Sequence, residues 1–196
     1  MPSIDELEIA DEPEAWSAAG FRVDGDVCTV SRVRLRLAGK GPRRGIVGWT
    51  LDARDAPGEP AAPHPNGAVA VDHVVMLSPD LDATVAELRG EGFDLCRLRE
   101  GDTPGGSTRQ AFFRAGEPIL EVVQAPEGTS AARGGAARLW GLALTVEDMD
   151  AAADALGDLL GTPRDAVQPG RRIATVRPEA GLGPAVAFMT PGRGAV

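Results

Sequence analysis

Two segments of this chain align with each other without a gap, and this internal repeat restricts the possible folds more than any other feature. The segments are DHVVMLSPDLDATVAEL (72–88) and WGLALTVEDMDAAADAL (140–156). Each begins with an apolar run typical of a strand and continues through an acidic turn into apolar residues at helical spacing. One such unit leaves a sheet face bare, so we expect the two copies to cover each other.

Three further strand patterns, separated by Gly-rich turns, follow each helix pattern and give the order β-α-β-β-β in both copies. The expected strands are 69–77, 93–98, 108–114 and 118–124, then 139–146, 164–168, 171–177 and 185–189. A fainter third copy opens the chain as IDELEIADEPEAWSAAGF. The predicted organisation is a degenerate module 1–53, a linker 54–68, a module 69–125, a linker 126–137 and a module 138–190, with 69–190 forming one domain.

Charge and composition limit the classes of partner and the compartment. The chain carries 29 acidic and 20 basic residues, a net charge of −9, which argues against nucleic acid as a partner. The opening residues MPSIDELEIADEPEA lack the apolar stretch of a secretory signal, and no run approaches the length of a membrane span. Cys28 and Cys96 lie far apart without CxxC spacing, as expected of reduced thiols. We therefore expect a cytoplasmic protein.

The tandem βαβββ unit, which opens with DHV and closes with ILEVV, resembles the vicinal oxygen chelate superfamily. That superfamily includes glyoxalase I, extradiol dioxygenases, methylmalonyl-CoA epimerase and bleomycin-resistance proteins. The resemblance covers 69–190 well and the first module weakly. It implies an α+β fold in which tandem modules form one curved mixed sheet around a cleft. The same scaffold supports many reactions, so the resemblance does not specify one.

In the metal-dependent members of this superfamily, the first and the last strand of each module supply one metal ligand each. Carried over to this sequence, those positions are His73 and Glu121. The resemblance thus implies a weakly held divalent metal (Zn²⁺, Mn²⁺, Ni²⁺ or Fe²⁺) on His73 and Glu121, with Glu121 or a metal-bound water handling proton transfer. Strand alternation predicts that His73 shares a face with Val71 and Val75.

The last module departs from this ligand pattern. Gly141 stands where a second histidine is expected, and the strand sequence AVAFMTP carries no carboxylate. In the first module, Glu6 takes the place of the histidine and Gly48 lies near that of the glutamate. A second histidine ligand is then available only if His64 of the linker folds over the cleft.

Polar residues of the other strands are candidates for ligand binding. Gln168, Arg171 and Arg172 lie in DAVQPGRRIATVRPEAG, and Gln110 lies in the equivalent strand of the middle module. Neighbours on a strand point to opposite faces, so one of the two arginines faces solvent. The other is expected to direct its guanidinium at a carboxylate or phosphate of the ligand.

Two classes of function remain open. In the first, the protein is an enzyme acting on a small molecule in the cleft between the modules, by metal-assisted lyase, isomerase or dioxygenase chemistry. In the second, it is a metal-free protein that binds or sequesters a small molecule, similar to bleomycin-resistance proteins. The odd number of modules predicts that the first covers its sheet by forming a homodimer or by capping an edge of the main sheet. A membrane partner is not expected.

Overall fold

The computed structural model describes residues 1–53, 58–103, 106–133 and 135–192. The N-terminal elements are β1 (Ile4–Ile9), α1 (Pro13–Ala18), β2 (Val27–Val30), β3 (Val33–Leu37) and β4 (Ile46–Leu51). The middle elements are β5 (Ala68–Ser78), α2 (Leu81–Gly90), β6 (Asp94–Thr103), β7 (Gly106–Arg114) and β8 (Ile119–Gln124). The last are β9 (Arg138–Val146), α3 (Met149–Leu156), β10 (Arg164–Asp165), β11 (Arg172–Thr175) and β12 (Ala185–Met189). Short 3-10 turns occur at Ser130–Ala132, Gly157–Leu159 and Pro178–Ala180.

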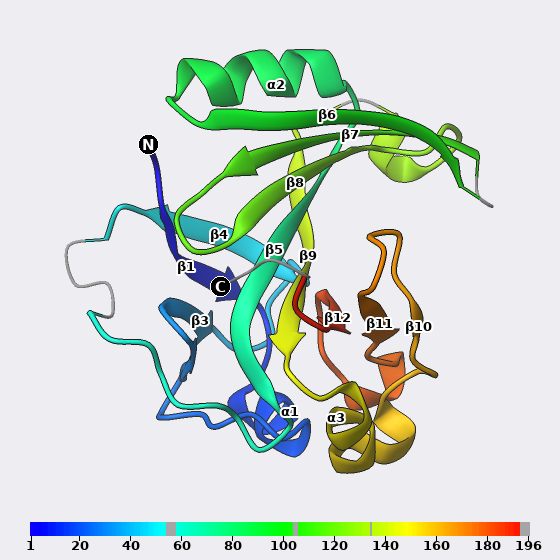
Figure 1. The fold of residues 1–196 in the computed structure, drawn as a ribbon. Helices are drawn as coiled ribbons and strands as arrows, with labels where there is room; N and C mark the ends of the chain where they lie inside the picture. The colour runs from blue at the N-terminus through cyan, green and yellow to red at the C-terminus, as the bar shows by residue number, and fades with distance from the viewer. Residues whose placement is uncertain (54–57, 104–105, 134, 193–196) are drawn as a thin grey trace.

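The middle and last modules form one mixed sheet of eight strands in the order β10-β11-β12-β9-β5-β8-β7-β6. The first strands of the two modules, β5 and β9, pair antiparallel at its centre, and each pairs in parallel with the last strand of its own module. The N-cap residues of the two helices, Asp80 and Asp148, are 68 positions apart, as are His73 and Gly141. Figure 1 shows the sheet curving, with α2 and α3 outside it. The predicted curved mixed sheet is confirmed.

The N-terminal module forms a separate sheet with a different strand order, β2-β3-β1-β4. In the repeated modules the first strand runs parallel to the fourth, whereas here β1 runs parallel to β3 and antiparallel to β4. Strand β4 is thus the antiparallel neighbour of β1, a place that β9 of the next module takes beside β5. The module keeps the order of elements along the chain but not the pairing of the repeat.

This small sheet packs against the back of the main sheet, on the side away from the concave face. Leu7 and Leu35 belong to the same buried core as Leu142 and Phe188 of the main sheet. The rings of Phe21 and Phe188 meet edge to face with centroids 6.4 Å apart. The expectation that this module caps an edge of the main sheet was wrong, because its apolar face is buried against the face of that sheet. The burial removes the need for a partner copy to cover this module, and homodimer formation stays a prediction.

The opposite face of the N-terminal sheet is charged. Glu6 is 8% exposed and accepts from Nε of Arg34 (3.0 Å) and Nε of Arg36 (2.9 Å). Glu6 is the counterpart of the histidine in the middle module, and the two guanidinium groups compensate its burial. Its role here is that of an ion-pair partner on the outer face.

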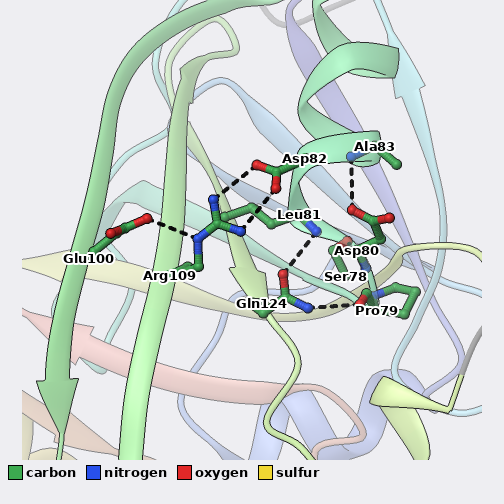
Figure 2. A network of polar contacts seen from close by, with 9 residues as sticks. All are labelled: Ser78, Pro79, Asp80, Leu81, Asp82, Ala83, Glu100, Arg109 and Gln124. Carbon is green, nitrogen blue, oxygen red and sulfur yellow. Dashed lines mark hydrogen bonds and ion pairs between the residues drawn. The ribbon is translucent and has the colours of Figure 1, made fainter.

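Helix α2 is fixed to the end of β8 by side chains at its start (Figure 2). Asp80 accepts from the backbone N–H of Ala83 (3.0 Å), as an N-cap residue does. Gln124, the last residue of β8, accepts from the N–H of Leu81 (3.0 Å) and donates to the carbonyl of Pro79 (2.7 Å). The helix start, and with it the end of β5, is thereby held against the sheet.

Strand β7 sends alternate side chains to opposite faces. Arg109 lies on the helix side, where it donates to both carboxylate oxygens of Asp82 and to Glu100 (Figure 2). The next residue, Gln110, lines the concave face. In the part of the chain that the structure describes, no helix is long and apolar enough to cross a membrane.

Candidate functional site

The site begins with a β-bulge in β5. The pairing of β5 with β9 shifts by one residue between Val71, opposite Leu144, and His73, opposite Ala143, so Asp72 is the extra residue. Val71 is consequently buried in the core. The expectation that Val71 and His73 share a face was wrong, because the bulge interrupts the alternation. The bulge also brings together the side chains of Asp72 and His73, which regular strand alternation would direct to opposite faces.

His73 and Glu121 meet across the adjacent parallel strands β5 and β8. Nε2 of His73 lies 3.3 Å from Oε2 of Glu121, which confirms the predicted approach of these two side chains. The other carboxylate oxygen of Glu121 accepts from Nε2 of Gln110 at 2.6 Å. Neither side chain is fully buried, with exposures of 17% for His73 and 13% for Glu121. Both can therefore reach a molecule in the cleft.

Behind His73, Asp72 and Arg171 complete the chain of contacts. Oδ1 of Asp72 lies 2.8 Å from Nδ1 of His73, and the guanidinium of Arg171 forks onto the same carboxylate. Arg171 is 9% exposed and also donates from Nε to the carbonyl of Thr190 (2.6 Å). Of the two neighbouring arginines predicted to divide between the faces, Arg172 is the solvent-facing one and pairs with Asp150 (2.8 Å).

Electrostatics separates the roles of the two carboxyl groups. Burial raises the pKa of Glu121, against the opposing influence of His73, Gln110 and Arg99. Burial also acts to raise the pKa of Asp72, but hydrogen bonds from His73 and Arg171 outweigh it and the pKa is lowered. Asp72 is thus an ionised acceptor at neutral pH, while Glu121 is the more easily protonated of the two.

These contacts fix one nitrogen of the imidazole. Because an ionised Asp72 only accepts, Nδ1 of His73 carries a proton and donates it to Asp72. Nε2 then faces Oε2 of Glu121. One proton, carried by either of these two atoms, forms a hydrogen bond between them. When one proton is shared between these two atoms, the pair is either imidazolium with carboxylate or imidazole with carboxylic acid, and both of these states can exchange a proton with a ligand.

Two adjoining cavities, of about 180 and 250 Å³, share His73, Glu121 and Ile173. The smaller cavity has the more polar lining, with Arg99, Gln110, Arg164 and Gln168 among its residues. The larger is mainly apolar and is lined by Val75, Val123, Trp140, Leu142, Ala185 and Ala187, among others. The cleft is thus amphipathic, with the two titratable side chains at the junction.

The predicted ligand-binding residues divide accordingly. Gln110 and Gln168 line the polar cavity, whereas Arg171 lies behind His73 and Arg172 points away. Arg99 and Arg164 also line this cavity and were missed. Asp72 was missed as a site residue as well, because the sequence carries no signal for the bulge that turns it towards His73.

The second half of the cleft supplies no equivalent donors. Ala187 pairs with Ala143 as Glu121 pairs with Val75, so an alanine stands at the place of the glutamate. At Gly141, the counterpart of His73, a Cβ atom would collide with the carbonyl oxygen of Ala185. No side chain of any kind fits there without movement of the backbone.

His64 does not reach the cleft. It is buried against the N-terminal module, where Nδ1 accepts from the N–H of Arg22 (2.9 Å) and Nε2 donates to the carbonyl of Thr29 (3.0 Å). The alternative in which His64 serves as a second histidine ligand was wrong, because both of its nitrogens are engaged by backbone groups.

The donor set does not fit a resident metal ion. Among the residues that the structure describes, no group of three or more His, Cys, Asp or Glu side chains could hold one. His73 and Glu121 offer two donors, whereas catalytic zinc sites draw on three protein ligands. The chemistry of the site therefore has to be derived from the side chains themselves.

No family model and no curated protein matches the chain. Solved structures do. Methylmalonyl-CoA epimerase from Mycobacterium tuberculosis is 21% identical with a TM-score of 0.53, covering 64% of this chain and 90% of that one. A methylmalonyl-CoA epimerase in complex with methylmalonyl-CoA and NH4+ is 24% identical (TM-score 0.51; 64% and 95% covered). A hypothetical protein from Bacillus halodurans C-125 is 17% identical (TM-score 0.52; 64% and 96% covered). The predicted vicinal oxygen chelate fold is thereby confirmed.

Proposed function

On this scaffold, we propose that the protein is an enzyme of isomerase or lyase type that moves a proton to and from a small molecule in the cleft. Glu121 is the base and His73 the acid. The observation that carries the proposal is the 3.3 Å approach of Nε2 of His73 to Oε2 of Glu121, at the junction of a polar and an apolar cavity.

The roles of the two residues follow from their protonation states. In the imidazolium–carboxylate state, Oε2 of Glu121 takes a proton from a ligand carbon beside a carbonyl group, and the electron pair moves to the carbonyl oxygen. The imidazolium of His73 then returns a proton. Burial raises the pKa of Glu121 and so makes its carboxylate a stronger base. Asp72 and Arg171 are positioning residues, since they hold the imidazole through Nδ1 without lining the cavities.

The lining of the cleft favours an amphipathic ligand. An anionic group is accommodated at Arg99 and Arg164, and an apolar part lies against Val75, Val123 and Trp140. One structure of the same fold is a complex with methylmalonyl-CoA. Acids and thioesters with an acidic C–H beside the carbonyl are therefore the first ligands to test.

A second function, binding without turnover, is favoured by a different observation. Both oxygens of Glu121 already have partners within the protein, Gln110 on one side and His73 on the other. A protein that sequesters a small molecule needs no free base.

Hydrogen–deuterium exchange separates the two functions. The protein is incubated in D2O with methylmalonyl-CoA and with a panel of simple 2-substituted acyl thioesters and carboxylic acids, and loss of the C–H signal is followed by NMR. We expect wild-type protein to catalyse exchange, and Glu121→Gln to lower the rate by about a hundredfold or more. Arg109→Gln, on the helix side of the same sheet, is the matched control and should exchange at the wild-type rate.

Two outcomes would contradict the acid–base proposal. If wild-type protein binds a compound by calorimetry without exchanging its C–H, the binding function is supported instead. If Glu121→Gln retains the wild-type rate, then Glu121 is not the base, whatever the ligand.

A further inference from the structure

A second groove lies on the back of the main sheet, where β4 of the N-terminal sheet approaches the start of β9. It has a volume of about 510 Å³. Its lining residues are Arg43, Arg44, Ile46, Val47, Gly48, Trp49, Met76, Ala137, Arg138 and Leu139. Both sheets contribute, so the groove exists only because the N-terminal module packs against the repeat.

The charge at this groove is opposite to that of the whole protein. The chain carries a net charge of −9, yet the charged lining residues are three arginines, two from the loop before β4 and one at the start of β9. Arg43 donates weakly to the carbonyl of Val47 (3.5 Å). Within the described residues, no ion pair joins Arg44 or Arg138 to a carboxylate. Their guanidinium groups are therefore available to an anion.

The floor of the groove is apolar and supported from below. Ile46 and Met76 are each 7% exposed, and Trp49 stacks on Phe93 with ring centroids 6.0 Å apart and an interplanar angle of 20°. An apolar floor beside several guanidinium groups matches a molecule with an apolar body and one anionic group.

We propose that this groove is a binding site for a small amphipathic anion, such as an aliphatic carboxylate, whose charged end is held by Arg43, Arg44 and Arg138. The site is separate from the cleft. Leu139 lines the groove, while the next residue, Trp140, lines the cavity that contains His73 and Glu121. The two sites lie on opposite faces of β9, so a ligand in the groove does not touch the acid–base pair.

Binding of octanoate to the full-length protein tests the proposal, with calorimetry for affinity and NMR for location. We expect octanoate to shift the Trp49 indole resonance. Octanoate that enters the cleft instead shifts the Trp140 indole and is counted as a separate event. Octanol, which has the apolar chain but no charge, and inorganic phosphate, which has the charge but no apolar chain, should both bind far more weakly. Arg44→Gln and Arg138→Gln should each weaken octanoate binding by about tenfold. Arg97→Gln, an exposed arginine on β6 outside the groove, is the matched control and should leave affinity unchanged.

Several results would overturn the site. These are no binding of octanoate, equal binding of octanol, wild-type affinity in the Arg44→Gln/Arg138→Gln double variant, or shifts at the Trp140 indole in place of Trp49. Glu121→Gln distinguishes this site from the cleft, because that substitution should leave the octanoate-induced shift of Trp49 unchanged even if it abolishes exchange of ligand C–H. Failure of the groove therefore leaves the proposed acid–base function untouched, and the reverse also holds.

Discussion

Replacing Asp72 by asparagine tests the ion pair with Arg171 that lies next to His73. Asparagine keeps the shape of the side chain and removes its charge. The guanidinium of Arg171, whose side chain is 10% exposed, then keeps the carbonyl of Thr190 as a partner but loses its carboxylate. The imidazole Nδ1–H loses an ionised acceptor in the same step.

The size of the effect follows from burial. Removing one member of a buried ion pair costs about 3–5 kcal/mol because the other charge is left uncompensated. The side chain of Asp72 is 20% exposed, which places the loss at the lower end, about 3 kcal/mol. For a chain of this size, each kcal/mol lowers Tm by about 2–4 °C. Asp72→Asn should therefore lower Tm by roughly 6–12 °C near neutral pH.

The direction of the pKa shift of Asp72 determines how its contribution to stability changes with pH. The pKa of Asp72 is lower in the folded protein than in the unfolded chain, so its stabilisation is fully present above the ordinary aspartate pKa. That contribution is lost as the pH falls through the lowered, folded value. The difference in unfolding free energy between wild type and Asp72→Asn, measured by urea denaturation, should be constant near neutral pH and shrink only in this acidic range.

A double-mutant cycle with Arg171→Met isolates the pair. The Asp72→Asn substitution leaves the charge of Arg171 uncompensated, and Arg171→Met removes that charge. The double variant should therefore be clearly more stable than the sum of the two single losses predicts. Additive losses, or a change in Tm below about 2 °C for Asp72→Asn, would show that the pair is effectively solvated and that the reasoning is wrong.

Four other predictions follow from the same geometry. Glu121→Gln should raise stability at neutral pH, because the pKa of Glu121 is raised in the folded protein and its carboxylate therefore destabilises the fold once it is ionised. Urea denaturation at several pH values measures the difference in unfolding free energy between variant and wild type, which should shrink as the pH is lowered. Gly141→Ala should cost about 1–3 kcal/mol in urea denaturation, because its Cβ meets the backbone of Ala185. Burial lowers the pKa of His64, so wild type should lose stability as pH falls from the ordinary histidine pKa towards the folded one, and His64→Gln should lose less. Added Zn²⁺, Mn²⁺, Ni²⁺ or Fe²⁺ should raise Tm little, and any rise should vanish in His73→Ala.

The main sheet was predictable because the repeat encodes it twice. The ungapped alignment of 72–88 with 140–156 specifies that β5 and β9, and α2 and α3, are equivalent, and their N-cap aspartates agree. The approach of His73 to Glu121 was predictable from the resemblance to the vicinal oxygen chelate superfamily, which implies that the first and last strands of one module each direct one residue into the cleft.

The remaining features depend on three-dimensional context that periodicity does not carry. Nothing local in the sequence marks the bulge at Asp72, because it is a property of the pairing between β5 and β9. Arg171 finds its partner 99 positions away, and the direction of its side chain is set by that contact. The N-terminal module was misplaced because its composition predicts an apolar sheet face but not which surface covers that face.

The collision that a side chain would meet at Gly141 has a consequence for how this protein can diversify. One half of the duplicated cleft carries the acid–base pair, while the other contributes mainly wall residues such as Gln168, Ile173 and Ala187. Substitutions on that wall can alter which molecule fits without touching His73 or Glu121, the residues of the proposed acid–base pair. If that proposal holds, reactivity and selectivity are inherited separately, except at Arg171, which comes from the wall side and holds Asp72.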